Sequence, residues 1–359
     1  MHTSFAEKII HWQLHHGRHD LPWQNTRDPY QIWVSEIMLQ QTQVSAVINY
    51  YQRFMTRFPD IATLANTPID EVMPYWAGLG YYARARNLHK AACVISNEFG
   101  GVFPTDFDAI HSLPGIGRST AAAISAFAYG QPRPILDGNV KRVFARYFGI
   151  SGDIRAKAIE DTMWKIAERE MPLCEVEAYI QGQMDLGATL CARGKPKCLL
   201  CPLKDSCIAQ LQGLTDSLPQ RATKKIITHR ETQMLVLLHQ NKVYLERRPP
   251  TGIWGGLNCL PEMNMDGDVI KTLRDKFGGD LQIENALQPL APIEHGFTHY
   301  SLTIYPLKIT IPAITKLPLT ANEQGAMWFD LDTFNASTND QNQHAAALPA
   351  PVKKILLAL

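Results

Sequence analysis

The sequence has no long hydrophobic run and no excess of either charge. No apolar stretch approaches the roughly 20 residues of a membrane-spanning helix. The first 17 residues hold Glu7, Lys8 and several histidines and lack the continuous apolar segment of a secretory signal. We therefore expect a cytoplasmic protein with no membrane partner. Because 35 Lys and Arg residues nearly balance 34 Asp and Glu residues, composition alone does not indicate a nucleic-acid partner.

Cysteine is also scarce, with seven residues, and an odd number in a cytoplasmic chain argues against a disulfide framework. Four of the seven are crowded into one short loop with the spacing C-x6-C-x2-C-x5-C: Cys191, Cys198, Cys201 and Cys207. Four thiolates can hold either a zinc ion or a [4Fe-4S] cluster. Zinc sites usually show two C-x2-C pairs and this loop has one, so the spacing favours the iron–sulfur cluster.

The spacing of apolar residues along the sequence changes near residue 212. Residues 5–212 show mostly helical spacing of apolar residues, and residues 28–58 describe one buried helical face that the polar segment 40–43 interrupts. Residues 213–228 are polar and basic and are interpreted as a linker. Residues 229–359 alternate strand-like runs, such as 234–239, 242–245 and 300–306, with helical segments at 269–277 and 351–359. The chain is therefore predicted to be multidomain, with a mostly α region followed by an α+β domain.

A short Gly-rich turn lies between two predicted helices at residues 113–117. Gly115 and Gly117 let the backbone turn tightly with its amides exposed, and the next helix presents its positive N-terminus to an anion. Such a helix-hairpin-helix grips a DNA phosphate without reading the base sequence. A plain connection between two helices has the same pattern, so this motif alone leaves both interpretations open.

Asp137 begins the segment Asp137-Gly138-Asn139, shortly after the hairpin. An aspartate at this place is often only the N-cap of the following helix. Taken together, the hairpin, the aspartate and the cysteine loop, in this order, resemble the endonuclease III superfamily of DNA glycosylases. Three further stretches, residues 21–23 (LPW), 34–44 (VSEIMLQQTQV) and 78–87 (GLGYYARARN), resemble the MutY family of adenine DNA glycosylases within it.

This resemblance implies a fold and a set of roles. Residues 22–132 would form the helix-hairpin-helix barrel, and residues 1–21 with 133–212 the module that carries the cluster. Glu36 would be the general acid that protonates an extruded adenine, and Asp137 would stabilise the oxocarbenium sugar. The contacts to DNA and to the base would come from the two hairpin glycines and from Gln41, Tyr81, Lys141 and Gln181. Gln41 and Tyr81 would wedge into the base stack, while Gln181 would help to hold the adenine.

The pairing of two carboxylates has a physical rationale. Adenine leaves poorly unless it is protonated, and a sugar cation needs a nearby negative charge. Two carboxyl groups can take these opposite roles if their surroundings separate their pKa values. Glu36 stands between Val34 and Ile37, and an apolar pocket would raise its pKa towards neutrality. By helical spacing alone, an exposed helix glutamate is the simpler interpretation.

Ser119 is a departure from part of the superfamily. The resemblance places a lysine here in relatives that also cut the strand, because its amine forms a Schiff base with the sugar. Serine cannot do so, which favours a glycosylase that leaves an intact abasic site. Lys141 lies near Asp137 in the sequence, and we expect it to contact phosphate.

The second domain resembles a Nudix fold at residues 247–257 and 260–262. A working Nudix hydrolase needs several glutamates on its helix to hold magnesium. In the matching stretch only Asp275 is acidic, and Lys276 follows it, so we expect hydrolysis to be lost. The resemblance instead implies that this domain recognises 8-oxoguanine opposite the adenine, through the loop Phe297-Thr298-His299.

The hypothesis is thus a monomeric DNA-repair enzyme of the bacterial cytoplasm, associated with the nucleoid. Its partner would be double-stranded DNA with adenine opposite 8-oxoguanine or guanine, and its cofactor a [4Fe-4S] cluster. Three alternatives remain: a glycosylase for another base that also has lyase activity, a non-catalytic DNA-binding protein with structural zinc, and a Nudix hydrolase with a DNA-binding appendage.

Overall fold

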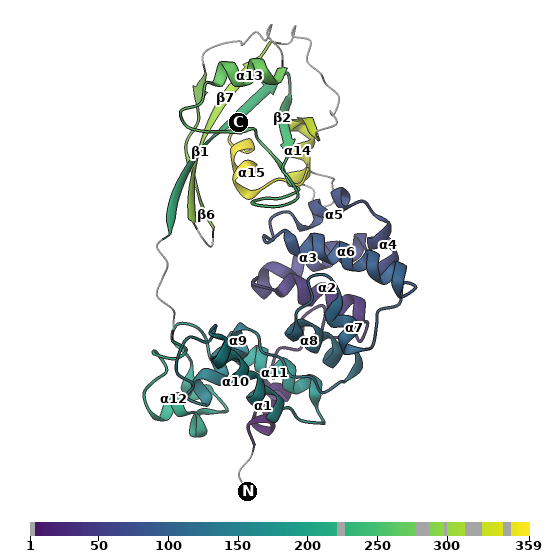
Figure 1. The fold of residues 1–359 in the computed structure, drawn as a ribbon, viewed down its shortest axis with the longest axis vertical. Helices are drawn as coiled ribbons and strands as arrows, with labels where there is room; N and C mark the ends of the chain where they lie inside the picture. Colours follow the sequence, from purple (N-terminus) through teal and green to yellow (C-terminus); the bar gives the residue numbers. More distant parts are fainter. Residues whose placement is uncertain (1–3, 221–226, 278–286, 298–299, 313–324, 340–345) are drawn as a thin grey trace. The chain divides into compact units, whose positions relative to one another are not determined.

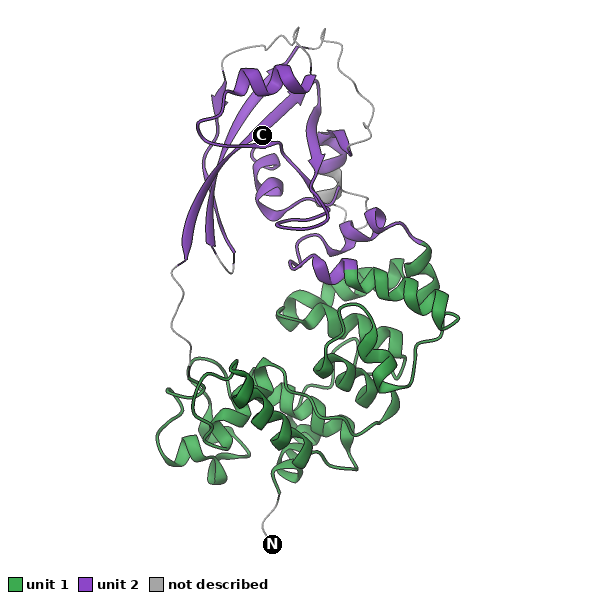
Figure 2. Cartoon of the chain, in the orientation of Figure 1, with its two compact units in different colours: residues 1–66, 87–224 green, residues 67–86, 225–359 purple. Residues whose placement is uncertain are grey.

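A computed structural model describes residues 4–220, 227–277, 287–297, 300–312, 325–339 and 346–359 (Figure 1). The chain forms two compact units (Figure 2). Unit 1 contains residues 1–66 and 87–224, and unit 2 contains residues 67–86 and 225–359. Segment 67–86, which holds helix α5 (Ile69–Trp76), therefore groups with the C-terminal part of the chain.

Unit 1 is helical, as predicted. Its longer elements are α1 (Phe5–His16), α2 (Pro29–Leu39), α3 (Val44–Arg57), α4 (Ile61–Asn66), α6 (Ala83–Glu98, of which the first turn belongs to unit 2), α7 (Phe107–Ser112), α8 (Arg118–Tyr129), α9 (Gly138–Tyr147), α10 (Lys157–Arg169) and α11 (Val176–Thr189). The cysteine loop adds the single turns η1 (Cys198–Leu200) and η2 (Lys204–Ser206) and the short helix α12 (Ile208–Leu211).

Local sequence signals set where several of these helices begin. Asp28 and Asp106 are the N-caps of α2 and α7, and their carboxylates accept hydrogen bonds from the amides of Tyr30 and Ala109. Capping satisfies amides that have no partner inside the helix. The predicted interruption at residues 40–43 is confirmed, because α2 ends at Leu39 and α3 begins at Val44.

The core around α11 combines segments that are far apart in the sequence. Helices α1, α8 and α9 all pack against α11. Phe5 and Ile9 of α1 are buried against Phe144 of α9 and against Tyr179 and Ile180 of α11. Segments from near the two ends of the unit 1 sequence are thereby packed together, and α2 packs against α8.

Unit 2 is built on a mixed β-sheet. Its strands are β1 (Thr228–His239), β2 (Lys242–Arg247), β3 (Asn258–Cys259), β4 (Glu262–Met263), β5 (Gln288–Pro289), β6 (Ile293–Gly296), β7 (Tyr300–Ile311) and β8 (Ala326–Asp330). The order β3-β2-β1-β7-β5 forms the main path, and β1 and β7 pair in parallel from Thr228–Tyr300 to His239–Ile311. Parallel neighbours need a long crossover connection, which here contains the predicted helix α13 (Val269–Phe277).

Alternate side chains along the strands point to one face of the sheet and form the core of unit 2. Leu235 and Leu237 of β1 and Ile309 of β7 point to the same face as Leu273 of α13 and Tyr244 of β2. Helices α14 (Leu331–Asn339) and α15 (Ala350–Leu356) follow the last strand. The predicted strands at 234–239, 242–245 and 300–306 are confirmed, although β1 and β7 are longer than their apolar runs suggest.

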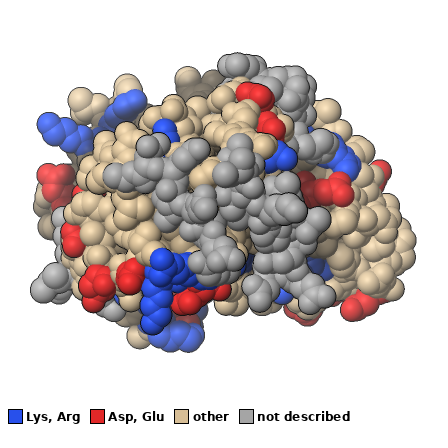
Figure 3. Space-filling view, turned by 90° about the horizontal axis from the view of Figure 1, so that it is seen from above, with Lys and Arg blue, Asp and Glu red and all other residues tan. Residues whose placement is uncertain are grey.

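The surface agrees with the near-zero net charge. On the face drawn in Figure 3, the Lys and Arg side chains of the described residues are interspersed with Asp and Glu, and most of the described surface carries neither. No helix in the described part of the chain is long and apolar enough to cross a membrane.

Candidate functional site

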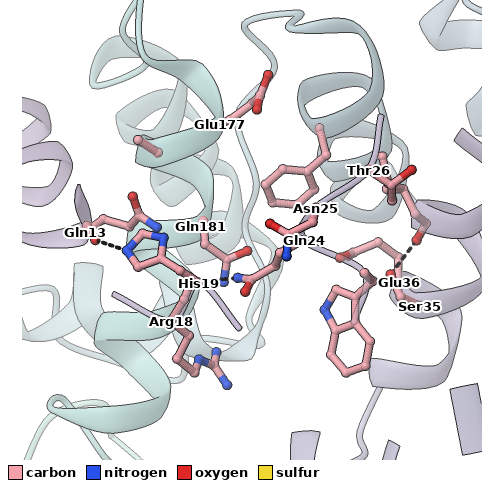
Figure 4. Close-up of a pocket in the computed structure, with 14 residues that line it drawn as sticks. Gln13, Arg18, His19, Gln24, Asn25, Thr26, Ser35, Glu36, Glu177 and Gln181 are labelled. Atoms are coloured by element: carbon pink, nitrogen blue, oxygen red, sulfur yellow. Dashed lines mark hydrogen bonds between the residues drawn. The ribbon is translucent and has the colours of Figure 1, made fainter. Parts of the chain in front are cut away.

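Unit 1 contains a cavity of about 190 Å³ between α2, α8, α11 and the segment that joins α1 to α2. Glu36 and Ser35 line it from α2, Gln181 from α11, and Arg18 and Gln24 from the connecting segment (Figure 4). Pockets for drug-sized ligands usually enclose about 300–1,000 Å³. A cavity of this size suits a ligand as small as one nucleobase, and its lining offers both acidic and amide groups.

Glu36 projects into this cavity from a largely buried helix. Its neighbours Trp33, Val34 and Ile37 are buried, because α2 lies in the middle of unit 1. Burial raises the pKa of Glu36 to about 8, and the nearby charge of Asp137 contributes to the same shift. The simpler interpretation as an exposed helix glutamate is therefore wrong. At neutral pH this carboxyl is mostly protonated and can donate a proton.

Asp137 caps a helix, and its negative charge also acts on Glu36. Its Oδ1 accepts hydrogen bonds from the amides of Asn139 (2.9 Å) and Val140 (2.8 Å) at the start of α9. Burial raises the pKa of Asp137, while these two amides and the charges of Arg142 and Lys141 act in the opposite direction. The helix N-terminus thus supports a negative charge here. The cap interpretation is correct, and it does not exclude a chemical role.

Ser119 holds the segment that carries Asp137. Its Oγ accepts a hydrogen bond of 2.9 Å from the amide of Leu136, the residue before Asp137. The position that bears an amine in the lyases is therefore used here to fix the backbone next to the carboxylate. Lys141 Nζ forms an ion pair with Glu160 at 2.9 Å. Lys141 would have to break this ion pair in order to contact a phosphate.

The hairpin has the geometry that its glycines predict. Gly115 adopts a φ of +82°, which L-residues rarely adopt, and a Cβ there would lie 2.7 Å from the Cβ of Asn87. Gly117 is the N-cap of α8, but it has no side chain that could accept a hydrogen bond from the helix amides. The first amides of this helix therefore keep their hydrogen-bonding capacity. The turn between α7 and α8 can therefore bind an anion through its backbone.

Two of the predicted DNA-contacting residues have a left-handed backbone. Gln41, between α2 and α3 in unit 1, has a φ of +56°, and Tyr81 in unit 2 has a φ of +50°. A non-glycine residue in this region carries strain that is typical of functional loops. The Tyr81 side chain is 48% exposed, which is unusual for an aromatic ring of this size.

Sequence reasoning missed two residues beside the cavity, Arg18 and Asp185. Asp185 is fully buried in α11, one turn after Gln181, and it accepts a hydrogen bond of 2.8 Å from Gln181 Nε2. Its Oδ1 also accepts hydrogen bonds from Arg18 Nε (2.7 Å) and Arg18 Nη2 (2.6 Å). The i to i+4 spacing of Gln181 and Asp185 on one helix was the available signal, but the ion pair with Arg18 joins distant segments.

The cysteine loop is held by two arginines of α9. Arg142 donates hydrogen bonds to the carbonyls of Cys191 (2.7 Å) and Gly187 (2.7 Å), and Arg146 Nη1 lies 3.4 Å from the Sγ of Cys191. Burial, together with the other three loop cysteines, raises the pKa of the Cys201 thiol to about 12. Four cysteine sulfurs in one loop are chemically the ligand type that an iron–sulfur cluster uses. Within the described residues, no group of three or more His, Cys, Asp or Glu side chains is arranged to hold a metal ion.

The predicted recognition loop in unit 2 is partly described. Phe297 follows β6 and stacks on Tyr300 at 4.7 Å, and it contacts Trp254 (5.4 Å) and His295 (4.6 Å). The other two residues of this loop, Thr298 and His299, lie outside the described residues.

Two glutamates of unit 2 form ion pairs with basic residues. Lys276 of α13 pairs with Glu246, and Arg248 pairs with Glu262. Each of these two carboxylates therefore already has a cationic partner in place of a magnesium ion.

The comparisons with known proteins cover both parts of the chain. Residues 34–169 match the model of the HhH-GPD superfamily base excision DNA repair protein, and residues 233–358 match the NUDIX domain model. An adenine DNA glycosylase of Buchnera aphidicola subsp. Acyrthosiphon pisum is 38% identical over 352 residues, which is 98% of this chain and 96% of that protein. The chain belongs to the adenine DNA glycosylase family. It is therefore a base-excision-repair enzyme of the class that hydrolyses N-glycosyl bonds.

A more distant relative and two solved structures are also similar to this glycosylase. The human adenine DNA glycosylase is 29% identical, covering 98% of this chain and 73% of that protein. A thermostable thymine-DNA glycosylase structure is 32% identical with a TM-score of 0.53, covering 58% of this chain and 95% of its own. An endonuclease III–DNA complex, 21% identical with a TM-score of 0.50 and covering 58% and 94% of the two chains, shows the fold alone. The predicted fold class, a helical helix-hairpin-helix core plus a Nudix-like α+β domain, is confirmed.

Proposed function

We propose that this glycosylase removes adenine from double-stranded DNA where it is paired with 8-oxoguanine or guanine, and leaves an abasic site. The observation that carries the chemistry is the contrast between two neighbouring carboxyl groups. Burial raises the pKa of both groups, to about 8 for Glu36, but only Asp137 has helix amides and nearby positive charges that act against this rise. One group is suited to donate a proton and the other to stay negative.

The reaction begins with extrusion of the base into the cavity of unit 1, which costs a few kcal/mol and less for a mispaired base. Protonated Glu36 transfers its proton to a ring nitrogen of adenine. The C1′–N9 bond then breaks and its electron pair leaves with the adenine. Asp137 stabilises the positive charge that develops on the sugar. Water adds to C1′, and the Glu36 carboxylate takes the proton that this water loses.

Glu36 is free to donate because nothing nearby competes for its proton. Across the described residues its carboxyl makes no hydrogen bond, so the proton can be passed to a ligand in the cavity. The Asp137 Oδ1 is occupied by helix amides, which leaves Oδ2 to face the sugar. Gln181 completes the site as a contact to the base.

Contacts to DNA are assigned to three places. The hairpin amides at Gly115 and Gly117 hold a phosphate, and Lys141 adds a second phosphate contact. Gln41 and Tyr81, whose backbones are strained, would wedge into the base stack and fill the gap that the extruded adenine leaves.

The thiolates of Cys191, Cys198, Cys201 and Cys207 are the residues that would hold a [4Fe-4S] cluster. When bound, the cluster would cross-link the loop through four iron–thiolate bonds. Arg142 and Arg146 fix this loop on α9, the helix that Asp137 caps. The loop is thereby coupled to the position of the sugar-facing carboxylate.

The Nudix-like domain is assigned to recognition of 8-oxoguanine through Phe297, Thr298 and His299. Phe297 supports this by its place in an aromatic cluster next to the turn between β6 and β7. The ion pair between Lys276 and Glu246 argues against magnesium-dependent hydrolysis in this domain. We further propose that the enzyme acts as a monomer in the bacterial cytoplasm, associated with the nucleoid.

The test is single-turnover base release from duplexes that carry A:8-oxoguanine, A:G or A:T, analysed with and without alkali. We expect release from the first two, little from A:T, and strand breaks that need alkali because position 119 carries no amine. Breaks without alkali would support the alternative of a bifunctional glycosylase. Absence of any adenine release by the iron-loaded protein would refute the assignment.

A further inference from the structure

The hydrogen bonds around Asp185 fix the orientation of one amide in the cavity. Asp185 is fully buried, and every group that reaches its carboxylate is a donor. Oδ1 accepts from Gln181 Nε2 at 2.8 Å and from Arg18 Nε at 2.7 Å, and Oδ2 accepts from the backbone amide of Arg18 at 2.8 Å. A carboxylate can only accept hydrogen bonds, so the nitrogen of the Gln181 amide must face it.

Gln181 therefore turns its other amide atom, Oε1, away from Asp185. Gln181 is part of the cavity wall, and in the described part of the chain its Oε1 has no hydrogen-bond partner. If the amide turned over, Oε1 would meet the Asp185 carboxylate and two acceptors would face each other. The buried acid thus gives the cavity an acceptor rather than a donor at this point.

Arg18 connects the same carboxylate to the segment between α1 and α2, which also lines the cavity. The Arg18 carbonyl accepts a hydrogen bond from Gln24 Nε2 at 2.9 Å, and Gln24 Oε1 accepts one from the amide of Leu21 at 3.1 Å. One buried carboxylate therefore holds both the base-facing amide of α11 and the segment between α1 and α2. The hydrogen bonds leave the Gln181 amide little freedom to adapt to a different ligand.

We propose that Asp185, supported by Arg18, is a positioning residue that sets the base specificity of the site. It presents Gln181 Oε1 as an acceptor for an exocyclic amino group, so that a 6-aminopurine is accepted and a 6-oxopurine is rejected. A 6-oxopurine would bring a carbonyl oxygen against Oε1 and leave both acceptors without a donor, which is costly in a buried site. The proposal rests on the proposed function, because it requires the flipped base to occupy this cavity.

A purely structural role predicts a different result. If Asp185 only joined α11 to the segment between α1 and α2, its loss would slow the release of every base by the same factor. The specificity role changes the ratio between bases. The ratio is therefore the quantity to measure.

The experiment compares single-turnover release of adenine, hypoxanthine and unsubstituted purine, each placed opposite the same base. The variant is Asp185→Asn. The side-chain amide of asparagine carries both a donor and an acceptor, so either orientation of the Gln181 amide can find a partner there. We expect the adenine-to-hypoxanthine rate ratio to fall by about tenfold or more relative to the wild type. Asp161→Asn, the same change at an exposed ion pair of α10, should leave the ratio unchanged.

A second background tests whether Asp185 acts through Gln181. In Gln181→Met, which has no acceptor, the discrimination should already be low and Asp185→Asn should not change it further. If Asp185→Asn folds poorly, Arg18→Met/Asp185→Asn removes the arginine charge left without its partner and serves in its place. Equal slowing on all three bases, or an unchanged ratio, overturns the proposal. Failure of the wild type to release adenine would refute the proposed function instead.

Discussion

Replacing Glu36 with glutamine should abolish catalysis and, at the same time, stabilise the protein. In the wild type, the pKa of Glu36 is raised from 4.5 to about 8, so the folded state binds a proton that the unfolded state releases. Stability from this group is fully present below pH 4.5 and is lost as the pH rises towards 8. Glutamine is neutral at every pH and has nearly the same shape as the protonated acid, so the variant avoids this loss.

The size of the effect follows from the pKa shift. Each pKa unit corresponds to about 1.4 kcal/mol, so at pH 7 the wild type loses up to about 3 kcal/mol relative to Glu36→Gln. The full loss of up to about 5 kcal/mol is reached above pH 8. Base release should fall by about 100- to 10,000-fold, because the variant has no proton to donate.

The assay is urea denaturation of the intact protein at pH 5 and at pH 8. The midpoints of wild type and Glu36→Gln should be close at pH 5, and the variant should be clearly more stable at pH 8. Glu98→Gln, at the exposed end of α6, is the control and should not show this divergence. Two results would show that Glu36 is not a buried acid. In the first, the variant is less stable than the wild type. In the second, its urea midpoint differs from that of the wild type by the same amount at both pH values.

Three further changes test other parts of the site. Asp137→Asn should keep the helix cap and change the free energy of unfolding by less than about 1 kcal/mol, while single-turnover base release falls by about 100- to 1,000-fold; a large loss of stability would make the cap its main role. Cys198→Ser should lower the iron content and the broad visible absorption of the purified protein, whereas unchanged iron would remove this residue from the ligand set. Gly115→Ala should destabilise the protein by about 2 kcal/mol or more, from its positive φ and the contact with Asn87. The matched Gly117→Ala, with open space around it, should cost less than about 1 kcal/mol in thermal or urea melts; equal costs would contradict the hairpin geometry.

The helices and the hairpin could be predicted because their signals are local. Asp106 caps α7 at the start of its helical sequence, and the polar segment 40–43 breaks the helix where the apolar pattern stops. Domain class could also be predicted, since helical spacing gives way to strand-like runs after residue 228. The lengths of β1 and β7 were underestimated: β1 begins in the polar segment at Thr228, which pairs with β7, and β7 continues beyond Pro306 to Ile311.

By itself, the sequence determined the family, the cysteine spacing and the identity of the two carboxyl groups. The pKa of Glu36 was decided only by the tertiary structure, since desolvation depends on distant segments that cover the carboxyl. The same holds for the ion pair of Asp185 with Arg18, because the segment after α1 meets α11 only in the folded chain. Asp137 shows both contributions: its place before Gly138 predicts a helix cap, and only the fold sets that cap beside Glu36.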